Sequence, residues 1–220
     1  MTKKLAIIHT TPVTIQPLKE LAAELLPDCE VVNLADDSIL PELNANGGQI
    51  DAIADRWRQY AQIAEKLGAD AILSACSSVG ELAERVQPDV GIPIVRIDRA
   101  MAEHAVRSAS VIGVAATLAT TLGPTERLLR RAAAEAGREV RLVPALVSEA
   151  YAKLAAGDRE GHDETLARAL TRLAEQTDIV VLAQASMARV LDSFEDVEKT
   201  KFASSPRLGM QMTAAVLSDR

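Results

Sequence analysis

The chain has 220 residues, of which 48% are hydrophobic and only 2% aromatic, and its 31 acidic residues outnumber 24 basic ones for a net charge of −7. Nucleic-acid-binding proteins need basic surfaces and often stacking aromatic side chains, so this composition argues against such a partner. No apolar run approaches the ~18 residues of a membrane span, and the run Leu5-Ala6-Ile7-Ile8 is too short for a signal peptide. We therefore expect a soluble, cytoplasmic, globular protein.

Short apolar runs alternate along the chain with longer segments of helical period, which is typical of an α/β protein with parallel sheets. The predicted strands are Leu5–His9, Glu30–Leu34, Ala71–Leu73, Ile94–Ile97, Val111–Val114, Val140–Val143 and Ile179–Leu182. In the first predicted helix, Leu18, Leu21, Ala22 and Leu25 recur at helical spacing, and Pro17 suits its first turn.

The two halves of the chain repeat the same plan. Three pairs of matching positions, Glu30 with Glu139, Ala71 with Ile179 and Thr10 with Thr117, are separated by 109, 108 and 107 residues. These near-equal offsets predict two α/β units, with a boundary within residues 98–110. We expect residues 1–98 with 206–220 to form the first domain and residues 99–205 the second. The segment Pro206–Ser218 has a helical pattern and is predicted to pack back on the first domain.

Small polar residues follow the predicted strands, at the sheet edge where parallel α/β proteins bind ligands. They suit a small carboxylate, because hydroxyls and the N–H groups of helix N-termini donate hydrogen bonds to anions. Helix capping is the plain alternative for any single loop. The segments are Thr10–Thr14, Ser74–Ser78, Ala116–Thr121, Gln184–Ser186 and Ser204–Pro206.

Cys76 is the candidate nucleophile or base of these segments. It precedes a predicted helix and adjoins Ser77 and Ser78, so we expect its thiolate to be stabilised and its pKa lowered. Cys29 begins the second strand, away from the strand exits, and is interpreted as structural. Both thiols are expected to be reduced.

Three histidines are available as partners for a thiol. His9 ends the first strand and is a possible partner, whereas His104 and His162 lie in charged helical segments where a solvated position is expected. No His, Cys or Asp cluster has the spacing of metal ligands, and no glycine fingerprint follows the first strand. The sequence therefore predicts neither a metal nor a dinucleotide cofactor.

These features together resemble the aspartate/glutamate/hydantoin racemase superfamily. The resemblance spans nearly the whole chain and rests on the two-unit plan and on four segments. They are the Thr-rich first exit, Ser74-Ala75-Cys76-Ser77-Ser78, residues 112–120 and Ser204-Ser205-Pro206-Arg207-Leu208-Gly209.

The resemblance implies two pseudo-symmetric parallel-sheet α/β domains with the active site in the cleft between them. It also implies cofactor-independent proton transfer at the carbon next to the carboxylate of a small acid. Typical racemases of the family use two cysteines, one per domain, and Cys76 takes the first position. The positions at which the family binds carboxylate oxygens correspond to Thr10, Thr11, Ser77, Ser78, Thr117 and Thr120.

The chain departs from the family at the second cysteine. The segment reads Leu182-Ala183-Gln184-Ala185-Ser186-Met187, so Gln184 stands there, 108 residues after Cys76. A glutamine has no titratable proton, although it can hydrogen-bond a carbonyl, carboxylate or enediolate oxygen. Two-base racemisation with a cysteine on each face is therefore excluded.

Three functions remain open. The first is an isomerase of the racemase or epimerase type, with Cys76 as acid/base on one face and Ser186, His9, water or the substrate serving the other. The second is a decarboxylase of a malonate-like acid, in which Cys76 protonates the enediolate. The third is a non-catalytic module that binds small carboxylates.

Charged residues near the exits could select a substrate. Asp98 and Arg99 follow the fourth strand and are interpreted as helix-start residues rather than selectors of a second charged group. Arg96 and Arg207 could each pair with a carboxylate, although surface roles are commoner. A homo-oligomer, most simply a dimer, is the default expectation for such an enzyme.

Overall fold

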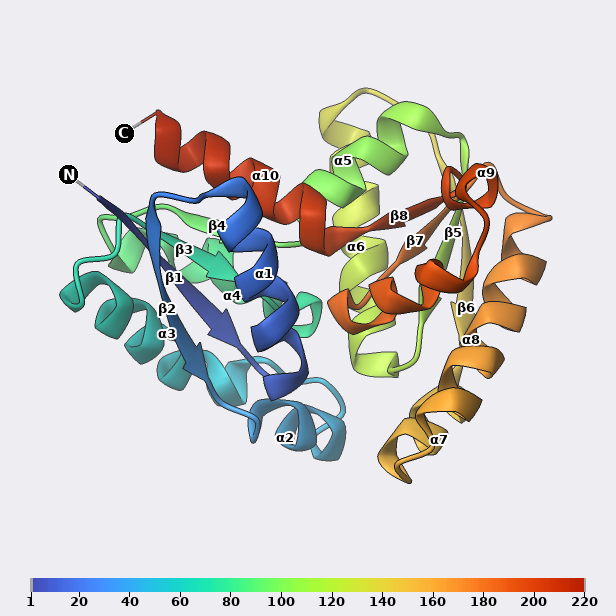
Figure 1. Ribbon diagram of the computed structural model, residues 1–220, viewed down its shortest axis with the longest axis horizontal. Coiled ribbons are helices and arrows are strands. Elements are labelled where there is room, and N and C mark those ends of the chain that lie inside the picture. The colour runs from blue at the N-terminus through green and yellow to red at the C-terminus, as the bar shows by residue number, and fades with distance from the viewer. Residues whose placement is uncertain (1, 220) are drawn as a thin grey trace. The chain divides into compact units, whose positions relative to one another are not determined.

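The computed structural model describes residues 2–219, which divide into two compact units. One unit runs through Arg99 and includes the segment from Pro206 onward, and the other comprises Ala100–Ser205. Each unit has its own four-stranded parallel sheet with helices around it (Figure 1). The α/β class and the parallel sheets predicted from the sequence are confirmed. No helix of residues 2–219 is long and apolar enough to cross a membrane.

The first unit has the strand order β2-β1-β3-β4. β1 is central, and its residues Leu5–Ile8 are buried, as a parallel strand covered on both faces requires. Its strands are β1 (Lys3–His9), β2 (Cys29–Ala35), β3 (Ala71–Ser74) and β4 (Ile94–Arg96). Its α-helices are α1 (Ile15–Leu25), α2 (Ile39–Ala45), α3 (Asp51–Lys66), α4 (Gly80–Val86) and α10 (Ser205–Ser218). Its 3-10 helices are η1 (Pro12–Thr14), η2 (Ser77–Val79) and η3 (Gln87–Asp89).

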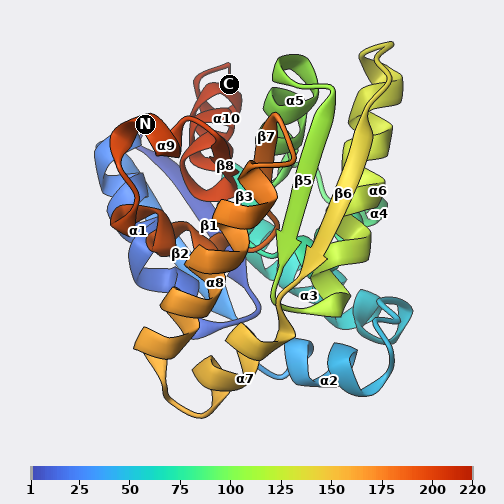
Figure 2. The same ribbon diagram turned by 90° about the vertical axis from the view of Figure 1, so that its right-hand side faces the viewer.

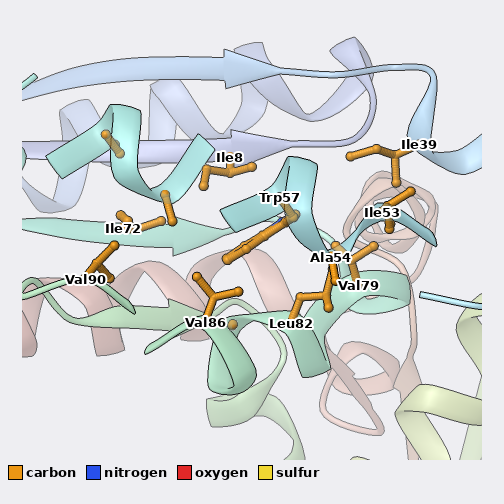
Figure 3. Close-up of a cluster of buried hydrophobic side chains, with 14 of the residues drawn as sticks. Ile8, Ile39, Ile53, Ala54, Trp57, Ile72, Val79, Leu82, Val86 and Val90 are labelled. Carbon is orange, nitrogen blue, oxygen red and sulfur yellow. The ribbon is translucent and has the colours of Figure 1, made fainter. Parts of the chain in front are cut away.

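The core of this unit centres on Trp57 of α3, which is fully buried (Figure 3). Its cluster includes Ile8 and Ile72 of the sheet together with Leu82 and Val86 of α4. α3 reaches this core because its buried residues recur every three or four positions along one face. Burial of a large aromatic side chain makes this cluster the main anchor of α3 and α4 on the sheet.

The second unit has the equivalent order β6-β5-β7-β8. In Figure 2, α6 and α8 lie on opposite sides of its sheet, and both contact β5 and β6. Its strands are β5 (Val111–Ala116), β6 (Arg141–Leu146), β7 (Ile179–Leu182) and β8 (Phe202–Ser204). Its helices are α5 (Arg99–Ser108), α6 (Ala119–Glu135), α7 (Ser148–Ala155), α8 (Arg159–Ala174), the 3-10 helix η4 (Ala185–Ser193) and α9 (Asp196–Lys199).

The repeat extends to single hydrogen bonds at the ends of the strands. Ala75 N donates to Ile8 O over 3.0 Å in the first unit, and Ala183 N donates to Ala115 O over 2.9 Å in the second. Each bond joins the residue that follows the third strand to the first strand of its sheet. The first, third and fourth strands of the two sheets therefore correspond at an offset of 107 or 108, whereas the register places β6 111 residues after β2.

The seven predicted strands are all present, with ends that differ by up to three residues. The short strand β8 was missed, because its three residues lie next to the polar segment that we read only as an exit. The predicted helix at residues 206–218 is present as α10 and packs on the first unit. Gly209 permits this contact, since a Cβ atom there would lie 2.4 Å from the carbonyl oxygen of Ile97.

Candidate functional site

Cys76 and Gln184 occupy the same place in their respective units. Each follows the third strand of its sheet and is the N-cap of a 3-10 helix, with φ/ψ of −140°/119° at Cys76 and −121°/134° at Gln184. The predicted equivalence of the two positions is thus a property of the backbone as well as of the spacing. Their side chains differ in the chemistry they offer.

The Cys76 thiol is half-buried and packs against the core cluster of the first unit. Burial raises its pKa, although hydrogen bonding by the Thr10 hydroxyl and by the backbone N–H groups of Ser78 and Val79 acts in the opposite direction. Our prediction of a lowered pKa was wrong, because desolvation outweighs these donors. The segment after Cys76 also begins as a short 3-10 turn, and α4 starts only at Gly80. The resting group is therefore a neutral thiol at neutral pH.

Several hydroxyls lie around this thiol. The buried hydroxyls of Thr10, Ser74 and Ser77 have no hydrogen-bond partner among residues 2–219. Unpaired buried donors are costly, so a polar ligand that accepted from them would be favoured. Thr11 is used differently, since its side chain accepts from Val13 N at 3.4 Å and caps η1.

His9 is fully buried, and both of its ring nitrogens are engaged. Nε2 lies 2.9 Å from Asn33 Oδ1 and Nδ1 lies 2.8 Å from the hydroxyl of Thr14. Burial lowers its pKa despite the hydrogen bond with Asn33, so burial favours the neutral ring. His9 therefore braces the exit of β1 and is not free to act as a base.

The other two histidines differ from each other. His104 is exposed, as expected. His162 was predicted to be solvated, and this was wrong: its side chain is buried, with Nδ1 2.6 Å from Asp163 Oδ1. His162 lies on the buried face of α8, together with Leu166 and Leu170, and the neighbouring carboxylate provides its polar partner. The many charged residues around His162 in the sequence led to the wrong prediction for this one buried position.

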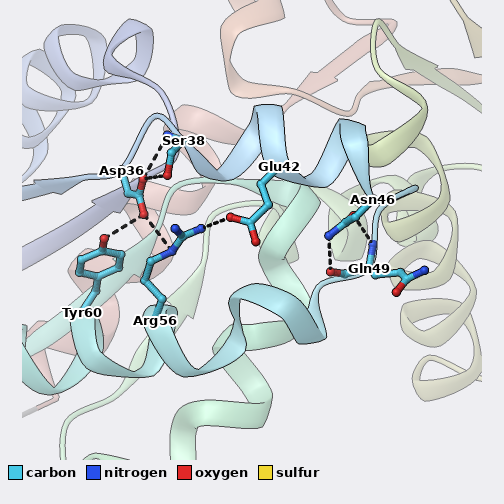
Figure 4. A network of polar contacts seen from close by, with 7 residues as sticks. All are labelled: Asp36, Ser38, Glu42, Asn46, Gln49, Arg56 and Tyr60. Atoms are coloured by element: carbon cyan, nitrogen blue, oxygen red, sulfur yellow. Dashed lines mark hydrogen bonds and ion pairs between the residues drawn. The ribbon is translucent and has the colours of Figure 1, made fainter.

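A polar network holds the exit of β2 beside His9 (Figure 4). Asp36 accepts from the Tyr60 hydroxyl at 2.8 Å and pairs with Arg56, whose Nη2 is 2.6 Å from Glu42 Oε2. Burial raises the pKa of Asp36, but the hydrogen bonds from Ser38 and Tyr60 and the charge of Arg56 outweigh it and lower that pKa. The network fixes α2 and α3 next to the carboxyl edge of the first sheet.

Gln184 is held by Thr117 in the second unit. Both the backbone N–H and the hydroxyl of Thr117 donate to Gln184 Oε1, at 2.7 and 2.8 Å. Because a backbone N–H can only donate, the atom facing it must be the amide oxygen, which settles the orientation of the side chain. Gln184 therefore offers the two N–H bonds of Nε2 to any ligand and has no proton to exchange.

The remaining predicted residues of the second unit lie beside this pair. Ser186 is the second residue of η4 and is half-buried, and Thr120 lies half-buried in the first turn of α6. Both are thus close in sequence to a helix start at the carboxyl edge of their sheet. At the exit of β8, the buried hydroxyl of Ser205 has no partner among residues 2–219.

One charged pair was not predicted from the sequence. Arg96 and Asp98 form a buried ion pair at the exit of β4, with Arg96 Nε 3.0 Å from Asp98 Oδ1. We expected Asp98 to be a helix-start residue and Arg96 to be a surface residue. Their spacing of two residues along an extended segment places both side chains on one side, which could have indicated the pair. Arg207 is exposed and pairs with Glu24 at 2.7 Å. Within residues 2–219, no group of three or more His, Cys, Asp and Glu side chains is arranged to hold a metal ion.

Comparison with known proteins identifies the family. The family model for Asp/Glu/hydantoin racemases matches residues 7–213, which is nearly the whole chain. The chain belongs to the Asp/Glu/hydantoin racemase family. Racemases are isomerases, so this is an enzyme family of that class. No curated protein is significantly similar to the chain in sequence.

Solved structures of this racemase family have the same fold. A putative Asp/Glu racemase from Yersinia pestis matches with a TM-score of 0.76 at 15% identity, covering 98% of this chain and 99% of that one. A glutamate racemase from Bacillus anthracis matches with a TM-score of 0.74 at 14% identity, covering 99% and 82%. The aspartate racemase of Picrophilus torridus matches with a TM-score of 0.73 at 16% identity, covering 97% and 94%.

Proposed function

We propose that this racemase-family protein is a cofactor-independent isomerase of the racemase or epimerase type. It moves a proton at the carbon next to the carboxylate of a small acid, and Cys76 is the acid/base. The observation that carries the proposal is the position of Cys76. It is a half-buried thiol at the carboxyl edge of a parallel sheet, with hydrogen bonding from Thr10, Ser78 and Val79.

The surrounding donors suit the charge that this reaction develops. Removal of an α-proton leaves an enediolate, whose two oxygens need preorganised hydrogen-bond donors. In the first unit, the buried hydroxyl of Ser77 is available, and Thr10 and Ser78 adjoin the thiol. In the second unit, Gln184 Nε2 would serve a carboxylate oxygen, whereas the donors of Thr117 are committed to Gln184.

The proton balance requires a second group. Because the resting Cys76 is a neutral thiol, it first loses its proton to water. The thiolate then takes the α-proton and becomes a thiol again, and the electron pair of the broken C–H bond enters the enediolate. Inversion then needs a proton delivered to the opposite face of the carbon. His9 is engaged at both nitrogens and Gln184 cannot supply a proton, which leaves Ser186, water or the substrate itself for this step.

A decarboxylase is the second candidate, and two observations favour it. The raised pKa of Cys76 keeps the thiol protonated at neutral pH, which suits a proton donor, and Gln184 provides only hydrogen-bond donors. In a malonate-like acid, the bond to one carboxylate breaks, CO2 leaves and the electron pair remains as an enediolate. The Cys76 proton is then transferred to carbon, and the thiolate is reprotonated from water.

One experiment separates these functions. The protein is incubated in heavy water with a panel of small amino, hydroxy and malonic acids, and α-proton exchange, optical rotation and CO2 release are followed. We expect exchange with inversion for an isomerase and CO2 release for a decarboxylase. Cys76→Ala is expected to lower either rate by about a thousandfold, the usual size of an acid/base contribution.

The matched control is Cys29→Ala, which removes the chain's other thiol, a half-buried group at the start of β2. This variant is expected to retain full activity. Activity that survives in Cys76→Ala would refute both catalytic assignments. Binding of an acid by the wild type without exchange, inversion or CO2 release would identify a carboxylate-binding module instead.

A further inference from the structure

The ion pair at the exit of β4 is unusual in its burial. The side chains of Arg96 and Asp98 are only 3% and 1% exposed, and two hydrogen bonds join them, Nε to Oδ1 at 3.0 Å and Nη2 to Oδ2 at 3.1 Å. Burying two charges removes their hydration, and such a pair is often no more stabilising than apolar side chains of similar volume. Its geometry, which locks the guanidinium plane in one orientation, therefore merits a functional explanation.

The guanidinium so held lies against α4. Arg96 Nη1 is 3.3 Å from Glu84 Oε1, within that helix. A Cβ atom on Gly80 would lie 2.5 Å from Nη2, 2.7 Å from Cζ and 2.8 Å from Nε of Arg96. The plane thus packs directly on the backbone of Gly80, at the point where η2 gives way to α4. Gly80 is four residues after Cys76, and the intervening turn supplies the N–H groups that face the thiol.

We infer that Arg96, oriented by Asp98, is a positioning residue that sets the Cys76 turn through its contacts with Gly80 and Glu84. The role assigned to Cys76 rests on the proposed function, whereas the mechanical coupling between Arg96 and the turn does not. Arg96 acts through the turn and has no direct part in the chemistry. Its effect reaches the thiol as a displacement of the N–H donors at Ser78 and Val79.

The second unit supplies an internal comparison. Arg96 pairs in register with Ser74 of the third strand, and the corresponding pair in the second unit is Ser204 with Leu182. A serine hydroxyl there cannot replace the five-donor guanidinium fork. The segment that follows Gln184 is also different: it is a nine-residue 3-10 helix, where the first unit has a three-residue turn and then α4. The arginine is therefore present at this strand position in the unit with Cys76 and is replaced by Ser204 in the unit with Gln184.

Thiol alkylation tests this inference without a substrate. In a Cys29→Ser background, the rate of reaction of Cys76 with iodoacetamide is measured against pH. Arg96→Met and Gly80→Ala should each displace the turn and weaken its donors. We expect the apparent pKa of Cys76 to rise by about one unit in each, with alkylation at pH 8 slowed about tenfold. The control is Arg85→Met. Arg85 lies on α4, as Gly80 does, and the substitution removes only its exposed ion pair with Asp51 of α3, so the alkylation profile should be unchanged.

The two substitutions should also be coupled. Removing the guanidinium in Arg96→Met makes room for the methyl group of Gly80→Ala, so the double variant should shift less than the sum of the single ones. Should Arg96→Met fail to fold, Arg96→Lys and Gly80→Ala carry the test. A profile that matches Arg85→Met in the folded variants, or simple additivity, would overturn the inference.

The two proposals fail separately. A shifted alkylation profile together with no turnover of any acid would retain the positioning role of Arg96 and refute the enzyme. Turnover that depends on Cys76, with an unshifted profile in Arg96→Met and Gly80→Ala, would retain the enzyme and refute the positioning role.

Discussion

The exits of β3 and β7 are built on one backbone plan but carry different chemistry. At the first, the nearby Thr10 hydroxyl acts to lower the pKa of Cys76, and at the second, Gln184 receives two hydrogen bonds from Thr117 at the equivalent position. A threonine thus stands at the equivalent position in both units, near an exchangeable thiol in the first and bonded to a fixed amide in the second. Under the proposed function, this difference means that the second unit would hold a substrate oxygen and the first would move the proton.

The first-strand exits differ in a complementary way. β1 ends at His9, which is buried and hydrogen-bonded to Thr14 and Asn33, whereas β5 ends at Ala116. The polar support of the edge is therefore concentrated in the unit with the thiol, as is the pair of Arg96 and Asp98. A site that must hold one reactive group needs more side-chain bracing than one that presents a neutral amide.

The largest expected effect comes from making the two third-strand exits alike. Gln184→Cys restores a titratable group at the second position, with Thr117 left in place to donate to it. For an acid that the wild type exchanges, we expect the rate of inversion to rise about a hundredfold relative to exchange, the scale of one added acid/base group. The measurement compares loss of optical rotation with deuterium incorporation.

Gln184→Ser is the control for that substitution, because it leaves a small polar residue without a thiol. An equal gain in Gln184→Ser would show that space rather than acid/base chemistry limits inversion. No gain in Gln184→Cys, with exchange intact, would mean that another group already serves the second face.

The sequence predicted what depends on pattern. Periodicity located seven strands, and the constant offset identified Gln184 as the partner position of Cys76, because parallel strands and their exits recur with the backbone. Local patterns failed where the outcome depends on packing. The pKa of Cys76 is decided by burial against the core, and the burial of His162 is decided by the face that α8 turns inward. Neither the pKa of Cys76 nor the burial of His162 can be predicted from the residues next to it in the sequence.

The orientation of Gln184 and the fork between Arg96 and Asp98 also lay beyond the sequence. Each depends on a contact between groups whose geometry only the folded unit defines, one across 67 residues and the other across the bend at the end of β4. Residue types alone suggested a hydrogen-bonding amide and a surface arginine. In the structure the Gln184 amide does form hydrogen bonds, whereas Arg96 is buried.

The second prediction makes the exit of β1 resemble that of β5. His9→Ala leaves Thr14 and Asn33 without their shared partner, and we expect a loss of about 1–3 kcal/mol in the free energy of unfolding at pH 7.5. Because burial lowers the pKa of folded His9 below its ordinary value of 6.5, the unfolded chain binds the proton first. The stabilisation is therefore complete above pH 6.5 and declines as the pH falls toward the folded pKa.

Urea unfolding of the wild type and His9→Ala across pH 5–8 checks this result. The two stability curves should approach each other on the acid side. His104→Ala, which removes an exposed histidine, should run parallel to the wild type throughout. Parallel curves for His9→Ala would contradict the neutral, doubly hydrogen-bonded assignment.

The smallest expected effect concerns the opposite edge of the sheets, where the units are most alike. Asp178 accepts from Ser110 N at 3.0 Å and Val111 N at 2.8 Å, and Asp70 accepts from Lys4 N at 2.7 Å at the same place in the first unit. The hydrogen bonds from Val111 and Ser110 lower the pKa of Asp178 below its ordinary value of 3.8. Its contribution is therefore present above pH 3.8 and is lost as the pH falls through the folded pKa.

We expect Asp178→Ala to lower the melting temperature slightly at pH 7, because the carboxylate is exposed and solvent screens its charge. The difference from the wild type should shrink as the pH is lowered through the carboxyl range. Asp178→Asn keeps an oxygen acceptor for the two N–H groups and should fall between them. This edge carries no candidate site residue, so the rate of Cys76 alkylation in both variants should match that of the wild type. A changed rate would contradict this expectation, because it would mean that the two edges of the sheet are coupled.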